Sequence, residues 1–325
     1  MGAIAPVRRL TIIIKYLEVK TEKLMFFNLL RTFTKRYPFH IPRASLLERL
    51  PNVPDNFGIF QSKSGIRYVA YPNGSDFIVK NIFWLGDFDP WVATVLKCLA
   101  HPDEVVCDIG AYIGDTSLPL ANCMGSLGHI YCFEPVPLLY ECLEKNVKAN
   151  SISCITSIPL ALSDRPGKLK LDPGGDLGMS QIVEGNQLNS RQNSIEVNVT
   201  TFDLWMKDSG IAQVAVVKID VEDHELEVLK GMKDTLSKHH IGSIVFERRQ
   251  DCDTTDAVVQ LLQRHGYRIF RIYKGILKTE VVELGCSATY LKKTYDYVAV
   301  IENSEFERRL LSCATVRPTA KSRVF

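Results

Sequence analysis

A chain of 325 residues, 46% of them hydrophobic, can bury a full core, which predicts a globular protein of one large domain or two smaller ones. A formal net charge of +2 and a pI near 8.0 give no sign of the concentrated basic face of a nucleic-acid binder, so no nucleic-acid partner is expected. No apolar run approaches the roughly 18 residues that span a bilayer, so no transmembrane segment is expected either.

The nine cysteines are expected to be reduced. Their number is odd, no CxxC pair occurs, and Cys107, Cys132 and Cys154 lie inside apolar, strand-like runs. Such thiols are typical of small core residues in a reducing compartment. The chain shows neither a signal h-region nor an N-myristoylation signal, and we therefore expect a cytoplasmic protein.

The first 40 residues are basic and contain one amphipathic pattern. Leu10, Ile13, Ile14 and Leu17 recur at helical spacing, which favours a helix. This helix either lies on a membrane surface or targets an organelle, or it packs on the rest of the protein. The absence of serine, which transit peptides are rich in, favours packing.

Prolines then interrupt residues 38–54, and alternation over residues 59–79 predicts a β-hairpin with its turn at 71–76 (YPNGSD). We expect residues 1–79 to form a helical and hairpin cap.

From residue 80 the pattern alternates between strands and helices. Apolar residues on consecutive positions, as in Val105, Val106 and Cys107, indicate a strand buried on both faces, which is typical of a parallel sheet flanked by helices. The alternation predicts a doubly wound α/β domain over residues 80–302. Strands are expected at 104–108, 129–133, 155–160, 214–220, 241–247, 267–272 and 295–301.

Two segments break this rhythm. Residues 167–200 are rich in glycine and polar residues, and a loop of that length is usually functional or disordered, so we interpret it as an insertion over the substrate site. Residues 303–325 are interpreted as a solvated basic tail.

The turn after the first strand of the domain is expected to hold a ligand, because ligands of such sheets bind at the carboxyl ends of the strands. Gly110 allows a sharp turn, and Gly114 allows a ligand or a packed strand to come close to the main chain. Pro119 lacks an N–H, so the following helix should begin near Asp115 or Thr116.

Glu134, in the FEP that ends the second strand, lies twenty residues after Gly114. An acid there can accept hydrogen bonds from ribose hydroxyls; alternatively it caps the next helix. The turn lacks the GxGxxG pattern of a dinucleotide site, and the buried acid Asp108 suits a ligand with a positive group, as in S-adenosylmethionine.

The strand over 214–220 ends in four ionisable residues, Asp220, Glu222, His224 and Glu225. Three carboxylates around one imidazole should keep His224 protonated and raise a carboxylate pKa, which makes this cluster the candidate catalytic centre. Acids decorating a helix N-terminus are the alternative. No metal is expected: HELEV is not HExxH, and magnesium held by the acids is the weaker reading.

Several motifs follow one another between residues 80 and 302: DIGAYIGDTS, FEP, ALSD, TTFD, KIDVEDHELEVLKG and IVFE. Together they resemble the FkbM family of S-adenosylmethionine-dependent methyltransferases. The resemblance implies a seven-stranded, Rossmann-like class I methyltransferase sheet with a reversed last strand, and an enzyme that methylates a hydroxyl of a small molecule or glycan.

The resemblance also implies roles for individual residues. Those that would contact the cofactor are Asp108, Gly110, Ala111, Gly114, Thr116, Glu134, Pro135, Ala161, Asp164 and Asp220. Asp220, Glu222 and His224 would face the methyl group and the acceptor. The chain departs from the family at Tyr112, where Asn is usual, and at Asp223, where Gly is usual.

Methyl transfer from a sulfonium needs an aligned acceptor and a dry site. We expect His224 or Glu222 to take or relay the acceptor's proton and Asp220 to steady the cofactor's positive end. Two other functions stay open: a nicotinamide-dependent oxidoreductase, and a cofactor-binding protein without transfer activity. The oligomeric state and the acceptor cannot be read from the sequence.

Overall fold

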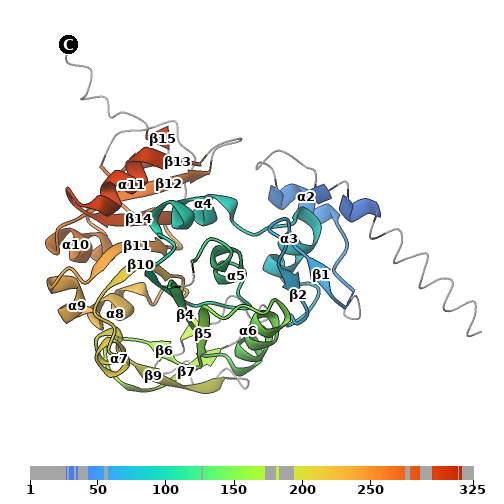
Figure 1. The fold of residues 1–325 in the computed structure, drawn as a ribbon, viewed down its shortest axis with the longest axis horizontal. Coiled ribbons are helices and arrows are strands. Elements are labelled where there is room, and N and C mark those ends of the chain that lie inside the picture. The colour runs from blue at the N-terminus through green and yellow to red at the C-terminus, as the bar shows by residue number, and fades with distance from the viewer. Residues whose placement is uncertain are drawn as a thin grey trace, which may run out of the picture.

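The computed structural model describes residues 27, 29–32, 34–35, 43–54, 58–125, 127–172, 181–182, 194–274, 279–285, 295–313 and 315–316. The amphipathic helix expected over residues 10–17 and most of the basic tail lie outside these residues. Within them, a central sheet with helices on both faces lies beside a smaller sheet and an N-terminal segment (Figure 1).

The central sheet of the described chain has nine strands, and seven of them form the expected core. Strands β5, β4, β3, β10 and β11 are parallel, whereas β14 is antiparallel to its neighbours β11 and β12, which confirms the reversed last strand. Two further strands, β13 and β15, extend the sheet beyond β12. The order is β15 (Thr315–Val316), β13 (Thr279–Glu283), β12 (Tyr267–Lys274), β14 (Asp296–Ile301), β11 (Ile241–Glu247), β10 (Val214–Ile219), β3 (Val105–Ile109), β4 (His129–Phe133) and β5 (Ile155–Ile158).

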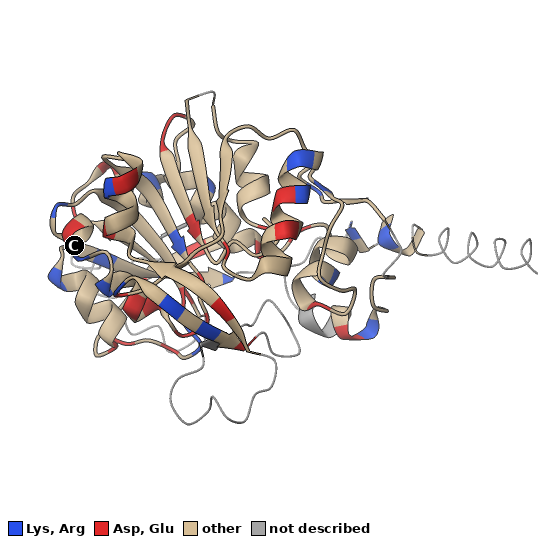
Figure 2. Ribbon diagram, turned by 90° about the horizontal axis from the view of Figure 1, so that it is seen from below, with Lys and Arg blue, Asp and Glu red and all other residues tan. Residues whose placement is uncertain are grey.

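Helices cover both faces of this sheet, as consecutive apolar residues in its strands require. In β3, Val106 packs into a core shared with α3–α6, whereas Cys107 and Ile109 pack into a second core shared with α7–α10. Basic and acidic residues are both scattered over the described elements (Figure 2), in keeping with the small net charge. The helices are α2 (Arg43–Arg49), α3 (Phe77–Leu85), α4 (Pro90–Leu99), α5 (Ser117–Ala121), α6 (Pro137–Ala149), α7 (Phe202–Ser209), α8 (Glu225–Lys230), α9 (Lys233–Ser237), α10 (Ala257–Arg264) and α11 (Glu305–Cys313).

The N-terminal hairpin differs from the expected one. Strands β1 (Phe60–Gln61) and β2 (Arg67–Tyr68) pair across residues 62–66, so the turn predicted at residues 71–76 is wrong. That segment leads into α3 instead, where the Asp76 carboxylate accepts a hydrogen bond from Val79 N at 2.9 Å and caps the helix. The expected boundary between residues 79 and 80 therefore falls inside α3, whose buried side chains share a core with the sheet.

The segment interpreted as an insertion loop contains strands. A four-stranded sheet has the order β6 (Ala161–Leu162), β9 (Ile195–Thr200), β7 (Gly167–Asp172) and β8 (Gln181–Ile182). In β7, lysine alternates with leucine. A short strand with this pattern is hard to distinguish from a polar loop by sequence alone.

The cysteines are not all reduced: Cys98 of α4 is disulfide-bonded, whereas Cys107, Cys132 and Cys154 are free as expected. Disulfides are rare in cytosolic proteins, so this bond removes one argument for a cytoplasmic location. Among the described residues, no helix combines the length and the apolar character that a membrane crossing needs.

Candidate active site

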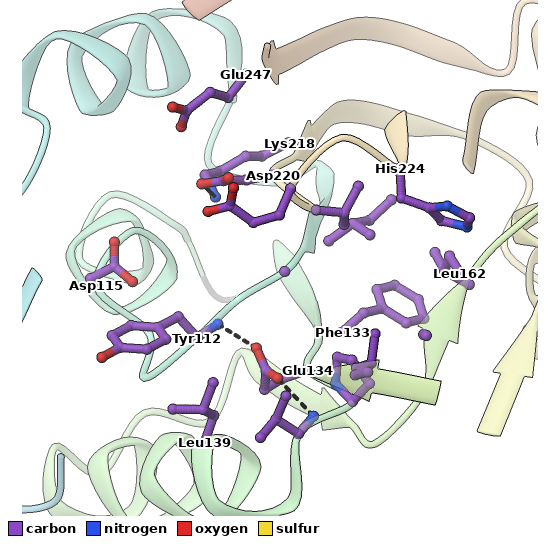
Figure 3. A pocket seen from close by; sticks show the side chains of 18 of the residues that line it. Tyr112, Asp115, Phe133, Glu134, Leu139, Leu162, Lys218, Asp220, His224 and Glu247 are labelled. Carbon is purple, nitrogen blue, oxygen red and sulfur yellow. Dashed lines mark hydrogen bonds and ion pairs between the residues drawn. The ribbon is translucent and has the colours of Figure 1, made fainter. Parts of the chain in front are cut away.

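A cavity of about 300 Å³ opens at the carboxyl ends of β3, β4, β10 and β11 (Figure 3). It lies where the strand order reverses beside β3, the place where open α/β sheets bind ligands. Its volume is at the lower end of the range of ligand sites. Of the residues predicted from the sequence, Gly110, Glu134, Pro135, Ala161, Asp220, Glu222 and His224 line it.

The turn after β3 requires glycine at its first position. Gly110 has φ +82°, and a Cβ there would lie 1.9 Å from the backbone oxygen of Asp220. Gly110 N and Ala111 N both donate to Phe133 O at 3.0 Å, so the turn joins the ends of three strands. A Cβ on Gly114 would meet Leu118 and Leu143, which gives this glycine a packing role.

Glu134 fixes the turn and, although it is only 4% exposed, lines the cavity. Its carboxylate accepts hydrogen bonds from Tyr112 N at 2.9 Å and from Val136 N, at the start of α6, at 2.8 Å (Figure 3). Glu134 therefore binds the residue that precedes α6 and also lines the cavity, where its role as a ribose ligand stays a prediction. Burial raises its pKa to about 8.

Lys218, which sequence reasoning missed, is a buried cation at the floor of the site. Its Nζ lies 3.4 Å from Asp108 Oδ1 and 3.1 Å from Asp220 Oδ2. Burial opposes its charge, but Asp108, Asp220 and Asp115 outweigh that effect and hold the lysine pKa well above its usual value. A lone lysine in an apolar strand was the signal, since such a side chain needs an acidic partner.

Asp108 does not line the cavity. It is 2% exposed, accepts a hydrogen bond from Ser117 Oγ and pairs with Lys218, so its positive partner belongs to the protein. Of the other predicted cofactor contacts, Ala111 is buried in the turn, Thr116 lines a smaller adjoining cavity, and Asp164 lies outside both cavities.

The predicted cluster of carboxylates around His224 does not form. Each acid has its own cation: Asp220 pairs with Lys218, Glu222 with Arg249 and Glu225 with Arg248. The His224 ring lies 2.8 Å from Ser163 Oγ through Nε2 and 3.7 Å from Glu227 Oε2 through Nδ1.

The turn between β10 and α8 has a left-handed backbone at two residues. Asp223, the departure noted above, has φ +76°, and Glu222 has φ +55°. Aspartate tolerates this conformation better than most residues, so the turn survives without glycine. Arg249 holds both side chains, with Nε 2.8 Å from Glu222 Oε2 and 3.4 Å from Asp223 Oδ2.

A row of carboxylates continues along the same edge of the sheet. Glu247 ends β11 and pairs in register with Asp296 of β14. Burial raises the pKa of Glu247 to about 9 and that of Asp296 to about 7. No group of three or more His, Cys, Asp or Glu side chains in the described part of the chain could hold a metal ion.

Comparison with known proteins identifies relatives for this region. Residues 108–269 match the family described as "Methyltransferase FkbM domain". The chain is 30% identical over 165 residues to the "Hexuronic acid methyltransferase AglP" of Haloferax volcanii. The aligned residues cover 50% of this chain and 63% of that protein. It is 26% identical over 157 residues to the "2-O-methyltransferase NoeI" of Sinorhizobium fredii, covering 44% and 63%.

A third relative, the "31-O-demethyl-FK506 methyltransferase FkbM" of Streptomyces tacrolimicus, is 25% identical over 200 residues, covering 52% of this chain and 74% of that protein. The chain spans 63% of the length of each of the first two relatives. Among solved structures, a precorrin-6y C5,15-methyltransferase from Geobacter metallireducens has a TM-score of 0.37 at 15% identity, covering 77% of this chain and all of that one. A likeness this distant adds nothing to the fold seen directly.

Proposed function

We infer that this chain, which belongs to the FkbM methyltransferase family, transfers a methyl group from S-adenosylmethionine to a hydroxyl of a sugar or another small molecule. One observation carries the proposal: the Gly110 turn and the Glu134 carboxylate meet at a single cavity, inside the segment that matches the family.

The residues present fit this cofactor. Each Glu134 oxygen accepts one backbone N–H and keeps a lone pair for a ribose hydroxyl. Phe133, Leu160 and Leu162 give the cavity an apolar wall suited to adenine, next to Ala161. Asp220 brings negative charge to the opposite side, where a cationic sulfur would be stabilised.

S-adenosylmethionine supplies a methyl group that its sulfonium already activates. The protein must therefore align the acceptor oxygen and exclude water. Glu222 and His224 line the cavity, but Arg249 and Ser163 engage their side chains, so we propose that they hold the turn rather than move the proton. Asp220 keeps its proposed role beside the cofactor.

We propose that segments outside the central sheet select the methyl acceptor. Phe77 of α3 and Phe88 before α4 pack edge to face, with ring centroids 6.3 Å apart, and both line the cavity. Phe77 is 49% exposed, and Leu171 of β7 completes this side. An aromatic pair at the rim of a cavity suits the apolar face of a sugar ring. One relative's name contains a hexuronic acid and another's describes a 2-O-methyltransferase, and both agree with a hydroxyl acceptor on a glycan or small molecule.

Calorimetry tests cofactor binding first, with S-adenosylmethionine and NAD titrated into the full chain. Binding of the former alone is expected; binding of NAD alone would favour the oxidoreductase. Mass spectrometry of a cell extract incubated with the protein and methyl-labelled S-adenosylmethionine then identifies the acceptor. A protein that binds the cofactor but labels nothing in a broad panel of extracts and sugars is a binding protein without transfer activity.

A further inference from the structure

Three carboxylates from neighbouring strands lie side by side at the cavity. Ile219 of β10 pairs in register with Phe246 of β11, so Asp220 and Glu247 follow as neighbours, and Glu247 pairs with Asp296. Figure 3 shows Glu247 and Asp220 at the same side of the cavity. The smaller adjoining cavity is lined by all three acids.

The two outer carboxylates each have a lysine, and the middle one has none. Lys218 Nζ lies 3.1 Å from Asp220 Oδ2, and Lys274 Nζ lies 2.7 Å from Asp296 Oδ2 and 2.7 Å from Asp89 Oδ2. Among the residues that the structure describes, none donates a hydrogen bond to the Glu247 side chain or pairs with it within 4.0 Å.

Glu247 is also accessible, because its side chain is exposed toward the cavity whereas the six preceding residues of β11 are buried. The cavity walls around it nevertheless remove part of its solvent, and this desolvation is the main cause that raises its pKa. The Asp220 and Asp296 carboxylates add to it, whereas Lys274 and Lys218 act in the opposite direction. An accessible carboxylate without a partner, next to a site for a cation, has the properties of a catalytic base.

We propose that Glu247 is the catalytic base of the methyl transfer, and that it ionises when the cofactor's sulfonium binds beside it. The acceptor O–H bond breaks and its proton passes to the Glu247 carboxylate; the oxygen lone pair forms the new O–C bond, and the C–S bond breaks with its electron pair left on sulfur. This assignment rests on the function proposed above. It gives the proton to a residue other than His224 or Glu222, whose side chains already have partners.

The ionisation of Glu247 can be tested without a methyl acceptor, by counting the protons that the protein releases when it binds a ligand. Calorimetric titrations at pH 8, in buffers of different ionisation enthalpy, count the protons released by the full chain with S-adenosylmethionine and with S-adenosylhomocysteine. Both ligands carry the ribose, so any proton that Glu134 gives up appears with both. Only the sulfonium carries the extra charge, so we expect S-adenosylmethionine to release about one proton more.

Variants assign that proton. Glu247→Gln should abolish the difference between the two ligands while both still bind, and Glu247→Asp should restore most of it. Glu144→Gln, the same change on the exposed surface of α6, should behave like the wild type. In the labelled-extract assay, Glu247→Gln should lower the transfer rate at least about 100-fold, the usual contribution of a general base.

The outcomes separate the two proposals. If neither ligand binds the wild-type chain, the proposed function itself fails. If both ligands bind but release equal numbers of protons, or if Glu247→Gln keeps the extra proton or the transfer rate, Glu247 is not the base and the proposed function stands.

Discussion

Replacing Lys218 with methionine should destabilise the protein strongly at neutral pH. The substitution leaves Asp108, 2% exposed, without its cation. Breaking a buried ion pair from one side costs about 3–5 kcal/mol. Asp108 can avoid ionisation by keeping a proton, but this costs about 1.4 kcal/mol for each pH unit above the unfolded pKa of about 3.9, or about 4 kcal/mol at pH 7.

The loss of stability in Lys218→Met depends on pH. Burial already raises the pKa of Asp108 in the folded chain, and removing Lys218 takes away the main effect that lowers it. The folded variant therefore binds more protons than the unfolded chain, and its stability falls as pH rises above about 4. Because the wild-type chain already bears part of this cost, the deficit relative to wild type should stay below about 4 kcal/mol at pH 7 and should be smaller at pH 5.

Urea denaturation of Lys218→Met and wild type at pH 7 and pH 5 measures both values. Lys145→Met is the matched control, because Lys145 pairs with Glu141 at 3.3 Å on the surface, with 60% of its side chain exposed. That variant should lose no more than about 0.5 kcal/mol at either pH. A Lys218→Met deficit as small as the control's, or one that is the same at both pH values, would refute the reasoning.

Four substitutions test local geometry. In Gly210→Ala the new Cβ meets no atom within 4 Å, so the variant should lose only the strain of φ +68°, about 1–2 kcal/mol of stability. Gly110→Ala adds a clash with Asp220 O and should lose about 3 kcal/mol or more. Urea denaturation measures both losses, and equal losses would contradict the clash. Glu134→Gln offers one oxygen to two backbone N–H groups, so S-adenosylmethionine should bind at least about 10-fold more weakly by calorimetry; unchanged affinity would remove Glu134 from the ribose site. Thr201→Ala removes the N-cap of α7 and should lower the free energy of unfolding by about 1 kcal/mol. An unchanged free energy of unfolding would show that this cap does not stabilise the helix.

The strands of the core were predictable because burial on both faces leaves continuous apolar runs, as in β10, where all six residues are buried. The Tyr71–Asp76 turn was misread for a physical reason. Asn, Gly, Ser and Asp favour hairpin turns and helix N-caps alike, and only the following apolar residues, buried on α3, decide between them. The strands of the smaller sheet were missed because their alternation, as in β7, is short and mostly exposed.

The site was predictable as a set of motifs but not as a set of partners. Sequence placed Asp220 and Glu134 at strand ends, and both line the cavity. It did not show that Lys218 neutralises Asp108, because that pairing depends on the register of β10 against β3. For the same reason the sequence did not show that Glu247, the last residue of the IVFE motif, lacks a cation while its neighbours have one.

The charges around the cavity favour a cationic cofactor over its neutral product. Two lysines, Lys218 and Lys274, face six carboxylates: Asp89, Asp108, Asp115, Asp220, Glu247 and Asp296. Burial raises the pKa of Asp115 to about 7 and that of Glu247 to about 9, so protons offset part of the excess at neutral pH. A sulfonium must displace such a proton, and this displacement becomes easier as pH approaches 9. In the proposed reaction, loss of the methyl group would remove the positive charge, so the carboxylate would take up a proton again and its attraction for the ligand would weaken. We therefore expect the ratio of affinities for S-adenosylmethionine and S-adenosylhomocysteine to rise between pH 6 and pH 9 and then level off, whereas a constant ratio would mean that these carboxylates do not sense the sulfonium.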